Sequence, residues 1–219
     1  MPQQEKLKEI DNFEIEIKIP IEDPERIMKS LLTRGFQKYQ RVIEEDMYYN
    51  SEYHDVRKCD EALRIRKTRD LLTGKTRAQI NFKGKKIDQI SMSRREYETG
   101  IEDPDCMEKI LGAFGFTRAA GVKKTRNYLQ RGEMTACLDQ VETRGNFLEL
   151  EVIVRKENLR ERYLSQMREI LQELGLSMDN TVRASYLSML MGKEENIKER
   201  NDHGEKNCGD ISGSGLSCG

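Results

Sequence analysis

Residues 12–25, NFEIEIKIPIEDPE, alternate three charged side chains with three isoleucines. Side chains alternate across a β-strand, so Glu14, Glu16 and Lys18 share one face and the isoleucines share the other. Neighbouring carboxylates can hold a divalent cation, and a nearby lysine can stabilise negative charge on a phosphate. This charged face lies either against bulk water or inside a polar cavity, and the alternation alone does not choose between them.

Later segments repeat this pattern of charged residues backed by apolar ones. Basic residues occupy four of these segments: Arg64 and Arg66 in ALRIRK, Lys83 in NFKGK, Arg94 in RREYE, and Lys124 with Arg126 in VKKTRNY. Acidic residues occupy the opening segment and two others: Asp139 in CLD, and Glu149 with Glu151 in FLELEV. A nucleoside triphosphate with Mg²⁺ or Mn²⁺ would satisfy both sets, because Arg and Lys bind phosphate and carboxylates bind the ion.

Two similar segments, displaced by 80 residues, predict helices that position the strands. IEDPERIMKSLLTRGF begins at Ile21 and IEDPDCMEKILGAFGF begins at Ile101. In each, an Asp can cap the helix, a Pro can take its first position, and a Gly can end it. A third helix is predicted over 159–176, where LRERYLSQMREILQELGL ends in the same way.

The alternating segments predict about eight strands, joined by short loops such as LLTGKT and LQRGEMT. Loops of this length favour hairpins, so we expect an antiparallel sheet. Strands this polar on one face suit a closed barrel with a wet interior, or a sheet with one face in solvent. Alternation does not separate the two arrangements.

Composition narrows the function classes. The chain has 219 residues, of which 35% are charged, yet its formal net charge is only −1. This balance argues against a nucleic-acid or membrane partner, and no apolar run reaches the ~20 residues of a membrane helix. The five cysteines form no CxxC pair, and His54 and His203 are isolated. We therefore expect loop histidines, no zinc site, and a reducing, cytoplasmic location.

The ordered set of motifs resembles the CYTH superfamily, the triphosphate tunnel metalloenzymes. The resemblance runs from about residue 12 to 190 and includes ASYLSML, which is similar to the family's closing Ser-Tyr helix. The segments YHDVRKCDEALRIR, FKGKKIDQISMSRREYE and LDQVETRGNFLELE are most similar to the class IV adenylate cyclase branch. Met92 stands where family members often carry a basic residue, so Arg94 would be the basic residue of that strand. Lys123 and Lys124 are alternative matches to one family position.

The resemblance implies an α+β fold, an antiparallel eight-stranded closed barrel with helices packed outside, spanning residues 12–191. Residues 1–11 would form a flexible N-terminus and residues 192–219 a disordered tail. It also implies three sets of site residues. The catalytic set is Lys18, Glu14 and Glu16; the substrate-binding set is Arg64, Arg66, Lys83, Arg94, Lys124, Arg126 and Arg183; the metal-binding set is Glu14, Glu16, Asp139, Glu149 and Glu151.

The implied activity is an adenylate cyclase reaction, in which ATP becomes cyclic AMP and pyrophosphate with the aid of Mg²⁺ or Mn²⁺. Two alternatives stay open. A triphosphatase would use the same tunnel to hydrolyse thiamine triphosphate or inorganic tripolyphosphate, and a binding protein would hold organic polyphosphates without turnover. A homodimer is compatible with small barrels of this sort, but the sequence carries no signature of one.

Overall fold

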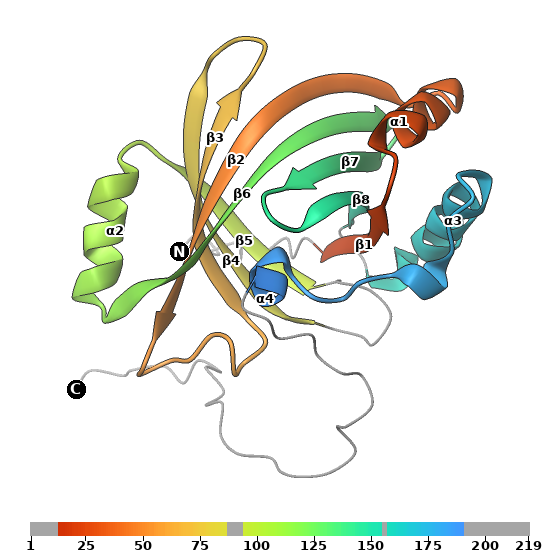
Figure 1. Cartoon of the computed structure of the whole chain (residues 1–219). Helices are drawn as coiled ribbons and strands as arrows, with labels where there is room; N and C mark the ends of the chain where they lie inside the picture. Colours follow the sequence, from red (N-terminus) through yellow and green to blue (C-terminus); the bar gives the residue numbers. More distant parts are fainter. Residues whose placement is uncertain (1–12, 87–93, 155–156, 191–219) are drawn as a thin grey trace, which may run out of the picture.

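Eight antiparallel strands close into one barrel in the computed structural model, which describes residues 13–86, 94–154 and 157–190 (Figure 1). The strands are β1 (Phe13–Ile21), β2 (Gln37–Ser51), β3 (Ala62–Asp70), β4 (Thr76–Lys86), β5 (Arg94–Ile101), β6 (Phe116–Arg131), β7 (Met134–Val141) and β8 (Gly145–Val154). The helices are α1 (Pro24–Thr33), α2 (Pro104–Ala113), α3 (Arg160–Glu173) and α4 (Tyr186–Leu190), with short 3₁₀ turns η1 (Glu157–Leu159) and η2 (Met178–Asn180).

The strand order around the barrel is β1-β5-β4-β3-β2-β6-β7-β8. Closure comes from β1, which pairs with β8 on one side and with β5 on the other. The closed barrel is therefore confirmed over the half-exposed sheet. Strand β6 begins at Phe116, ahead of the segment VKKTRNY, because residues 116–121 pair with the end of β2.

The helix boundaries follow the predicted caps. Asp23 accepts a hydrogen bond from the backbone N–H of Arg26, and Pro24 begins α1. Asp103 caps α2 in the same way. After α1 the chain turns through Gly35, whose φ of 84° is costly for other residues. The internal repeat thus marks two equivalent helix-loop units.

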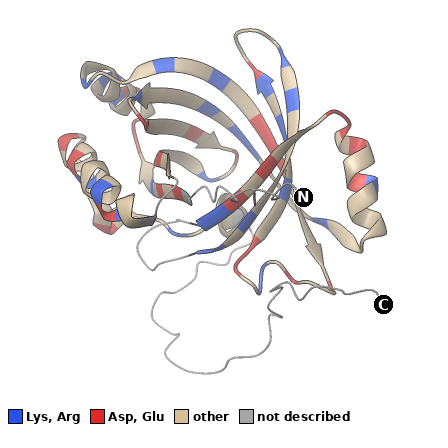
Figure 2. Cartoon of the chain, turned by 180° about the vertical axis from the view of Figure 1, so that it is seen from behind, with Lys and Arg blue, Asp and Glu red and all other residues tan. Residues whose placement is uncertain are grey.

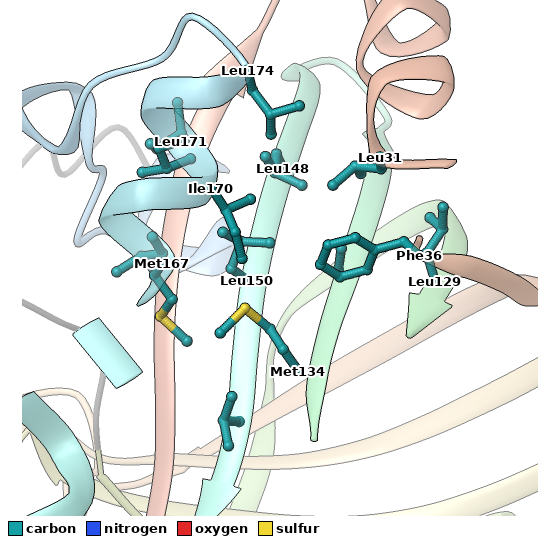
Figure 3. Packing of buried hydrophobic residues seen from close by; sticks show 14 of the residues in the cluster. Leu31, Phe36, Leu129, Met134, Leu148, Leu150, Met167, Ile170, Leu171 and Leu174 are labelled. Carbon is teal, nitrogen blue, oxygen red and sulfur yellow. The ribbon is translucent and has the colours of Figure 1, made fainter. Parts of the chain in front are cut away.

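The helices pack outside the barrel. In Figure 1, α1 and α3 lie at one side of the barrel, and α2 lies at the opposite side. The isoleucines of the opening strand point outward into a buried core shared with α1, α3, β7 and β8. Figure 3 shows Met167, Ile170 and Leu171 of α3 facing Leu148 and Leu150 of β8. This core fixes the outer face of the strands, and period-two alternation then turns their charged residues inward.

Three expectations fall on residues outside the described ranges. These are the departure at Met92, the flexible segment 1–11 and the disordered segment 192–219. None of the described helices is both long enough and apolar enough to span a bilayer.

Replacing Leu150 with alanine tests this core. The Leu150 side chain is fully buried against α3, so we expect Leu150→Ala to lower the free energy of unfolding by about 2–5 kcal/mol. The control is Ile153→Ala on the same strand, where the side chain is 67% exposed and the loss should stay below about 1 kcal/mol. Urea denaturation of both variants measures the difference, and equal losses would contradict the outward packing of Leu150.

Candidate active site in the barrel interior

The first and last strands bring distant charged residues side by side. In the β1–β8 ladder, Glu16 lies opposite Glu151, and Lys18 lies opposite Glu149. Directly opposed residues of an antiparallel pair have Cβ atoms about 4.5–5.5 Å apart. Figure 2 shows Lys and Arg in blue and Asp and Glu in red recurring along the strands of the barrel.

These residues face a cavity of about 530 Å³ inside the barrel. The cavity is lined by eleven of the predicted site residues: Glu14, Glu16, Lys18, Arg64, Arg66, Lys83, Arg94, Lys124, Arg126, Glu149 and Glu151. Their side chains are largely withdrawn from solvent, Lys124 to 3% exposure. The charged face of the opening strand therefore lines an enclosed space, not the outer surface.

The two remaining predicted residues lie differently. Asp139 on β7 is buried beneath the cavity wall, where its carboxylate accepts hydrogen bonds from Lys124, Arg126 and the Tyr186 hydroxyl. Arg183 lies half-buried in the segment between η2 and α4, and it does not line the cavity among the described residues. A metal-binding role for Asp139 and a phosphate-binding role for Arg183 stay predictions.

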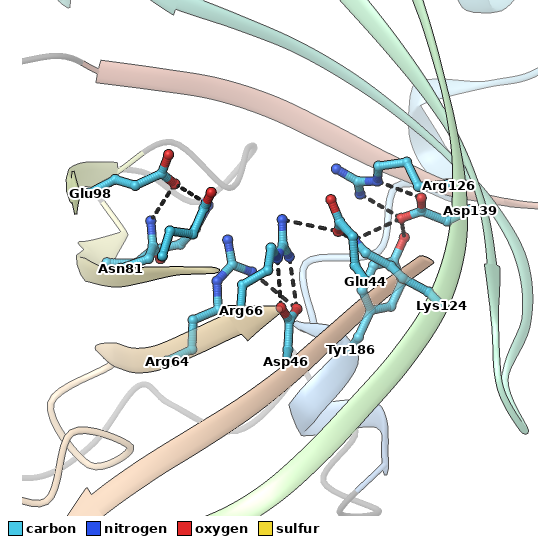
Figure 4. Close-up of polar contacts among 12 residues, drawn as sticks. Glu44, Asp46, Arg64, Arg66, Asn81, Glu98, Lys124, Arg126, Asp139 and Tyr186 are labelled. Carbon is cyan, nitrogen blue, oxygen red and sulfur yellow. Dashed lines mark hydrogen bonds and ion pairs between the residues drawn. The ribbon is translucent and has the colours of Figure 1, made fainter. Parts of the chain in front are cut away.

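One acid on β2 holds the paired arginines of β3. The Asp46 carboxylate accepts hydrogen bonds at 2.6 and 2.7 Å from Arg66 and at 3.4 Å from Arg64 (Figure 4). Burial opposes ionisation of Asp46, but the two guanidinium groups lower its pKa to about 2. Asp46 is therefore ionised at neutral pH, and it holds both arginines in place before any ligand arrives.

A second acid on β2 links this pair to the cations of β6. Glu44 lies 3.0 Å from Arg66 and 3.3 Å from Lys124, and it accepts a hydrogen bond from the Tyr128 hydroxyl at 2.7 Å. Burial opposes ionisation of Glu44, but Arg66 and Lys124 lower its pKa well below the usual range. The basic side of the cavity is thus a connected network across β2, β3 and β6.

A tyrosine of α4 contacts the same network of charged residues. The Tyr186 ring lies 4.1 Å from the Lys18 ammonium and 4.9 Å from that of Lys124, while its hydroxyl donates to Asp139 at 2.8 Å. Cation–π contacts of this kind stabilise desolvated ammonium groups. Tyr186 thus joins the closing helix to the barrel interior.

On the acidic side, two lysines are shared among four carboxylates. Lys83 lies 2.6 Å from Glu14 and 3.0 Å from Glu96. Lys18 lies 3.2 Å from Glu149 and 3.6 Å from Glu16. Burial opposes protonation of Lys18, but Glu149 and Glu16 raise its pKa above the usual value. Burial also opposes protonation of Lys83, but Glu14 and Glu96 raise its pKa above the usual value, so both lysines stay charged.

Glu151 completes this side without a cation of its own. Its carboxylate has no ion-pair partner among the residues that the structure describes. Burial, followed by the neighbouring charge of Glu14, raises the pKa of Glu151 to about 8. Burial also raises the pKa of Glu14 and of Glu16, with Glu149 adding to the effect at Glu16.

The excess of carboxylates over lysines on this side of the cavity fits a bound divalent cation. Carboxylates that approach one another in a buried site stay ionised when a metal ion offsets their charge. Glu14, Glu16 and Glu151 offer oxygen ligands of the kind that Mg²⁺ and Mn²⁺ prefer. Glu149 is already held by Lys18 and Arg126, so it is the more constrained of the predicted ligands.

Sequence reasoning missed the two acids of β2. The run Glu44-Glu45-Asp46 gives no clean alternation, so either parity was compatible with the strand. The structure turns Glu44 and Asp46 inward and leaves Glu45 on the surface, paired with Lys123. The adjacent apolar residues Val42 and Ile43 have opposite parity, so this segment offers no signal that fixes which acids face inward.

Burial also distinguishes the two lysines of β6 that are candidates for the phosphate-binding position. Lys124 is 3% exposed and contacts Glu44 and Asp139, whereas Lys123 is 47% exposed and points to the outer surface. The alignment with Lys124 as the inward residue is therefore the one that the barrel adopts.

Comparisons with known proteins agree with this geometry. The CYTH domain family model matches residues 12–186. A Methanocaldococcus jannaschii protein named "Putative adenylate cyclase MJ0240" is 37% identical over 177 residues, which cover 81% of this chain and 98% of that protein. The solved structure of the PH1819 protein from Pyrococcus horikoshii has a TM-score of 0.74 at 34% identity and covers 82% of this chain and 98% of its own.

A more distant structure shares the fold. It is the Hippeastrum protein HpAC1, at 17% identity and a TM-score of 0.61, covering 85% of this chain and 99% of its own. The family match extends over most of the chain and includes every residue that lines the cavity. The chain belongs to the CYTH family of triphosphate tunnel metalloenzymes, which act on triphosphate substrates with divalent metal ions.

Proposed function

We propose that this protein is a class IV adenylate cyclase, which converts ATP to cyclic AMP and pyrophosphate. The observation that carries the proposal is one cavity with cations from β3, β4, β5 and β6 on its wall and carboxylates from β1 and β8 beside them. A triphosphate with a divalent ion complements that lining in both charge and hydrogen bonding. The name of the 37% identical relative supports the same activity.

In this proposal the basic wall binds the triphosphate. Arg64 and Arg66 are oriented by Asp46, so little side-chain entropy is lost when phosphate oxygens replace part of its contacts. Lys83, Lys124 and Arg126 add charge from β4 and β6, and Arg94 adds a guanidinium from β5. Because these groups lie in an enclosed space, each contact with phosphate is stronger than it would be in water.

The acidic wall would hold Mg²⁺ or Mn²⁺, with Glu14, Glu16 and Glu151 as the first ligands to test and Glu149 beside them. When bound, such an ion supplies Lewis-acid stabilisation of phosphate oxygens and lowers the pKa of an attacking hydroxyl. Lys18 lies between Glu149 and Glu16, where its ammonium can stabilise charge on the reacting phosphate. Lys18 is too strongly held in its charged form to act as a base.

A triphosphatase is the second candidate. The same cations and carboxylates would serve a reaction in which water attacks the terminal phosphorus, so the two activities differ in where the nucleophile lies. The Hippeastrum protein, whose likeness to this chain shows the fold alone, is named "Putative adenylyl cyclase HpAC1" and is described as having a dominant triphosphatase activity. A binding protein without turnover is disfavoured, because binding a polyphosphate does not by itself require a separate group of carboxylates on the cavity wall.

The test is a product assay with the purified protein, ATP and Mn²⁺. We expect cyclic AMP and pyrophosphate, resolved by chromatography from ADP and free phosphate. Glu16→Gln keeps the size of the side chain but removes a metal ligand, so we expect turnover to fall about 100-fold or more. Release of ADP and phosphate in place of cyclic AMP would support the triphosphatase, and full activity of Glu16→Gln would refute the metal assignment.

The stability of the metal-free protein should fall as pH rises from about 5 to about 8. Burial raises the pKa of Glu151 from 4.5 to about 8, so the folded state keeps a proton that the unfolded state releases. This stabilisation is complete below the pKa of Glu151 in the unfolded protein, and it is lost as pH rises past the pKa of Glu151 in the folded protein. Glu14 and Glu16 shift in the same direction, so they add to the effect.

Thermal unfolding across this pH range measures the effect. Mn²⁺ should raise the midpoint more at the upper end of the range, because it replaces the lost protons. Glu151→Gln, which cannot ionise, should flatten the metal-free profile. A profile that is equally steep in Glu151→Gln would contradict the assignment.

A further inference from the structure

A loop outside the barrel interior brings together three potential metal ligands. The loop joins β2 to β3, and its shape is set by Asn50, which accepts a hydrogen bond from the Val56 N–H and donates one to Asp55. The Glu61 N–H donates to the Val56 carbonyl at 2.7 Å, and the Cys59 N–H donates to the Asp55 carbonyl at 3.1 Å. Val56 is 2% exposed, so it anchors the loop to the barrel. The backbone that carries Cys59 and Glu61 is therefore fixed.

Within this loop the side chains of His54, Cys59 and Glu61 converge. One ligand atom from each residue lies within 4.8 Å of the other two. The His54 Nε2 atom is 2.6 Å from a Glu61 oxygen, and the Cys59 thiol is not in a disulfide. His54 is 46% exposed and Glu61 is 20% exposed, so an ion could enter from solvent. Among the described residues that line the tunnel cavity, none of these three appears.

The donor types indicate a different metal from that of the tunnel. A nitrogen, a sulfur and an oxygen form the mixed set that Zn²⁺ binds, whereas Mg²⁺ and Mn²⁺ prefer oxygen alone. Around a tetrahedral zinc, ligand atoms are about 3.3–3.8 Å apart, given bonds of roughly 2.0–2.3 Å. The His54–Glu61 contact would have to widen and lose its shared proton, which is the usual exchange when a metal replaces a proton between two ligands.

We propose that His54, Cys59 and Glu61 form a second cation site, separate from the tunnel, that takes one Zn²⁺ ion with solvent completing its coordination. The alternative is a hydrogen-bonded His–Glu pair with a thiol beside it by coincidence. This proposal departs from the expectation of no zinc site, which rested on the lack of CxxC spacing and of a second nearby histidine in the sequence. The three ligands meet because the loop folds back on itself.

The position of the loop indicates what the ion would do. Glu61 directly precedes Ala62, which begins β3 and lines the tunnel cavity. The adjacent Asp60 accepts hydrogen bonds from the backbone and the side chain of Lys86 at the end of β4. An ion at this loop would therefore fix the junction of β3 and β4 close to Arg64. Its role is structural, and binding should raise the thermal stability of the folded protein.

Cobalt(II) is the probe for this site, because a thiolate ligand gives it a near-ultraviolet charge-transfer band that carboxylates do not give. The protein for the test is the full chain carrying His203→Gln, Cys208→Ser and Cys218→Ser, which removes the thiol and imidazole donors of residues 191–219. We expect the band to saturate at one ion per chain and to disappear when Zn²⁺ is added. The same protein should gain thermal stability in Zn²⁺.

Further substitutions in this background identify the residues that bind the cobalt ion and give the band. Cys59→Ser should abolish both the band and the Zn²⁺-dependent stabilisation. His54→Gln and Glu61→Gln should each weaken cobalt binding by about tenfold or more, as loss of even an outer partner of a metal ligand typically does. Cys106→Ser on the surface of α2 and Cys137→Ala on β7 should leave the band intact. Absence of the band, or a band that survives Cys59→Ser in a chain with unchanged circular dichroism, would overturn the proposal.

Discussion

Charge buried in a closed barrel is the constraint on which the rest of this structure depends. Each ionised group removed from water loses several kcal/mol of hydration unless an opposite charge and hydrogen bonds replace it. Here the replacements come from neighbouring strands, as where Asp46 of β2 holds Arg66 of β3. A slip of one residue between those strands would turn Asp46 outward and leave the guanidinium unpaired. The buried network and the strand register therefore require each other.

The balance of charge differs between the two sides of the cavity. On the basic side, Glu44 and Asp46 are ionised and already neutralise part of the arginine and lysine charge. On the acidic side, burial, followed by the neighbouring charge of Glu14, raises the pKa of Glu151 to about 8. In the proposed function, a polyanion that arrives with a divalent ion would complement the charge on both sides of the cavity. The outer core of isoleucines and leucines makes this possible, since it stabilises the barrel without using its interior.

Much of this site follows from alternation in the sequence. The parity of Glu14, Glu16 and Lys18 is unambiguous because isoleucines separate them, and the structure turns all three inward. Alternation fails where charges are consecutive, as in Glu44-Glu45-Asp46 and Lys123-Lys124, because only packing decides which parity faces the core. Alternation also does not distinguish Asp139, whose carboxylate accepts hydrogen bonds from three donors, from the carboxylates that line the cavity. The proximity of His54 and Cys59 depends on a loop conformation that no periodicity in the sequence encodes.

The two faces of β6 can be compared by calorimetry. Inorganic tripolyphosphate is titrated, in the presence of Mg²⁺, into the variants Lys124→Gln and Lys123→Gln. The substitutions are chemically identical and adjacent, but one removes a cavity cation and the other a surface cation. We predict that Lys124→Gln weakens binding about 10- to 100-fold, as loss of a buried charged hydrogen bond does, and that Lys123→Gln changes it by less than about twofold. Equal effects of the two substitutions, or unchanged binding in Lys124→Gln, would contradict a phosphate site inside the barrel.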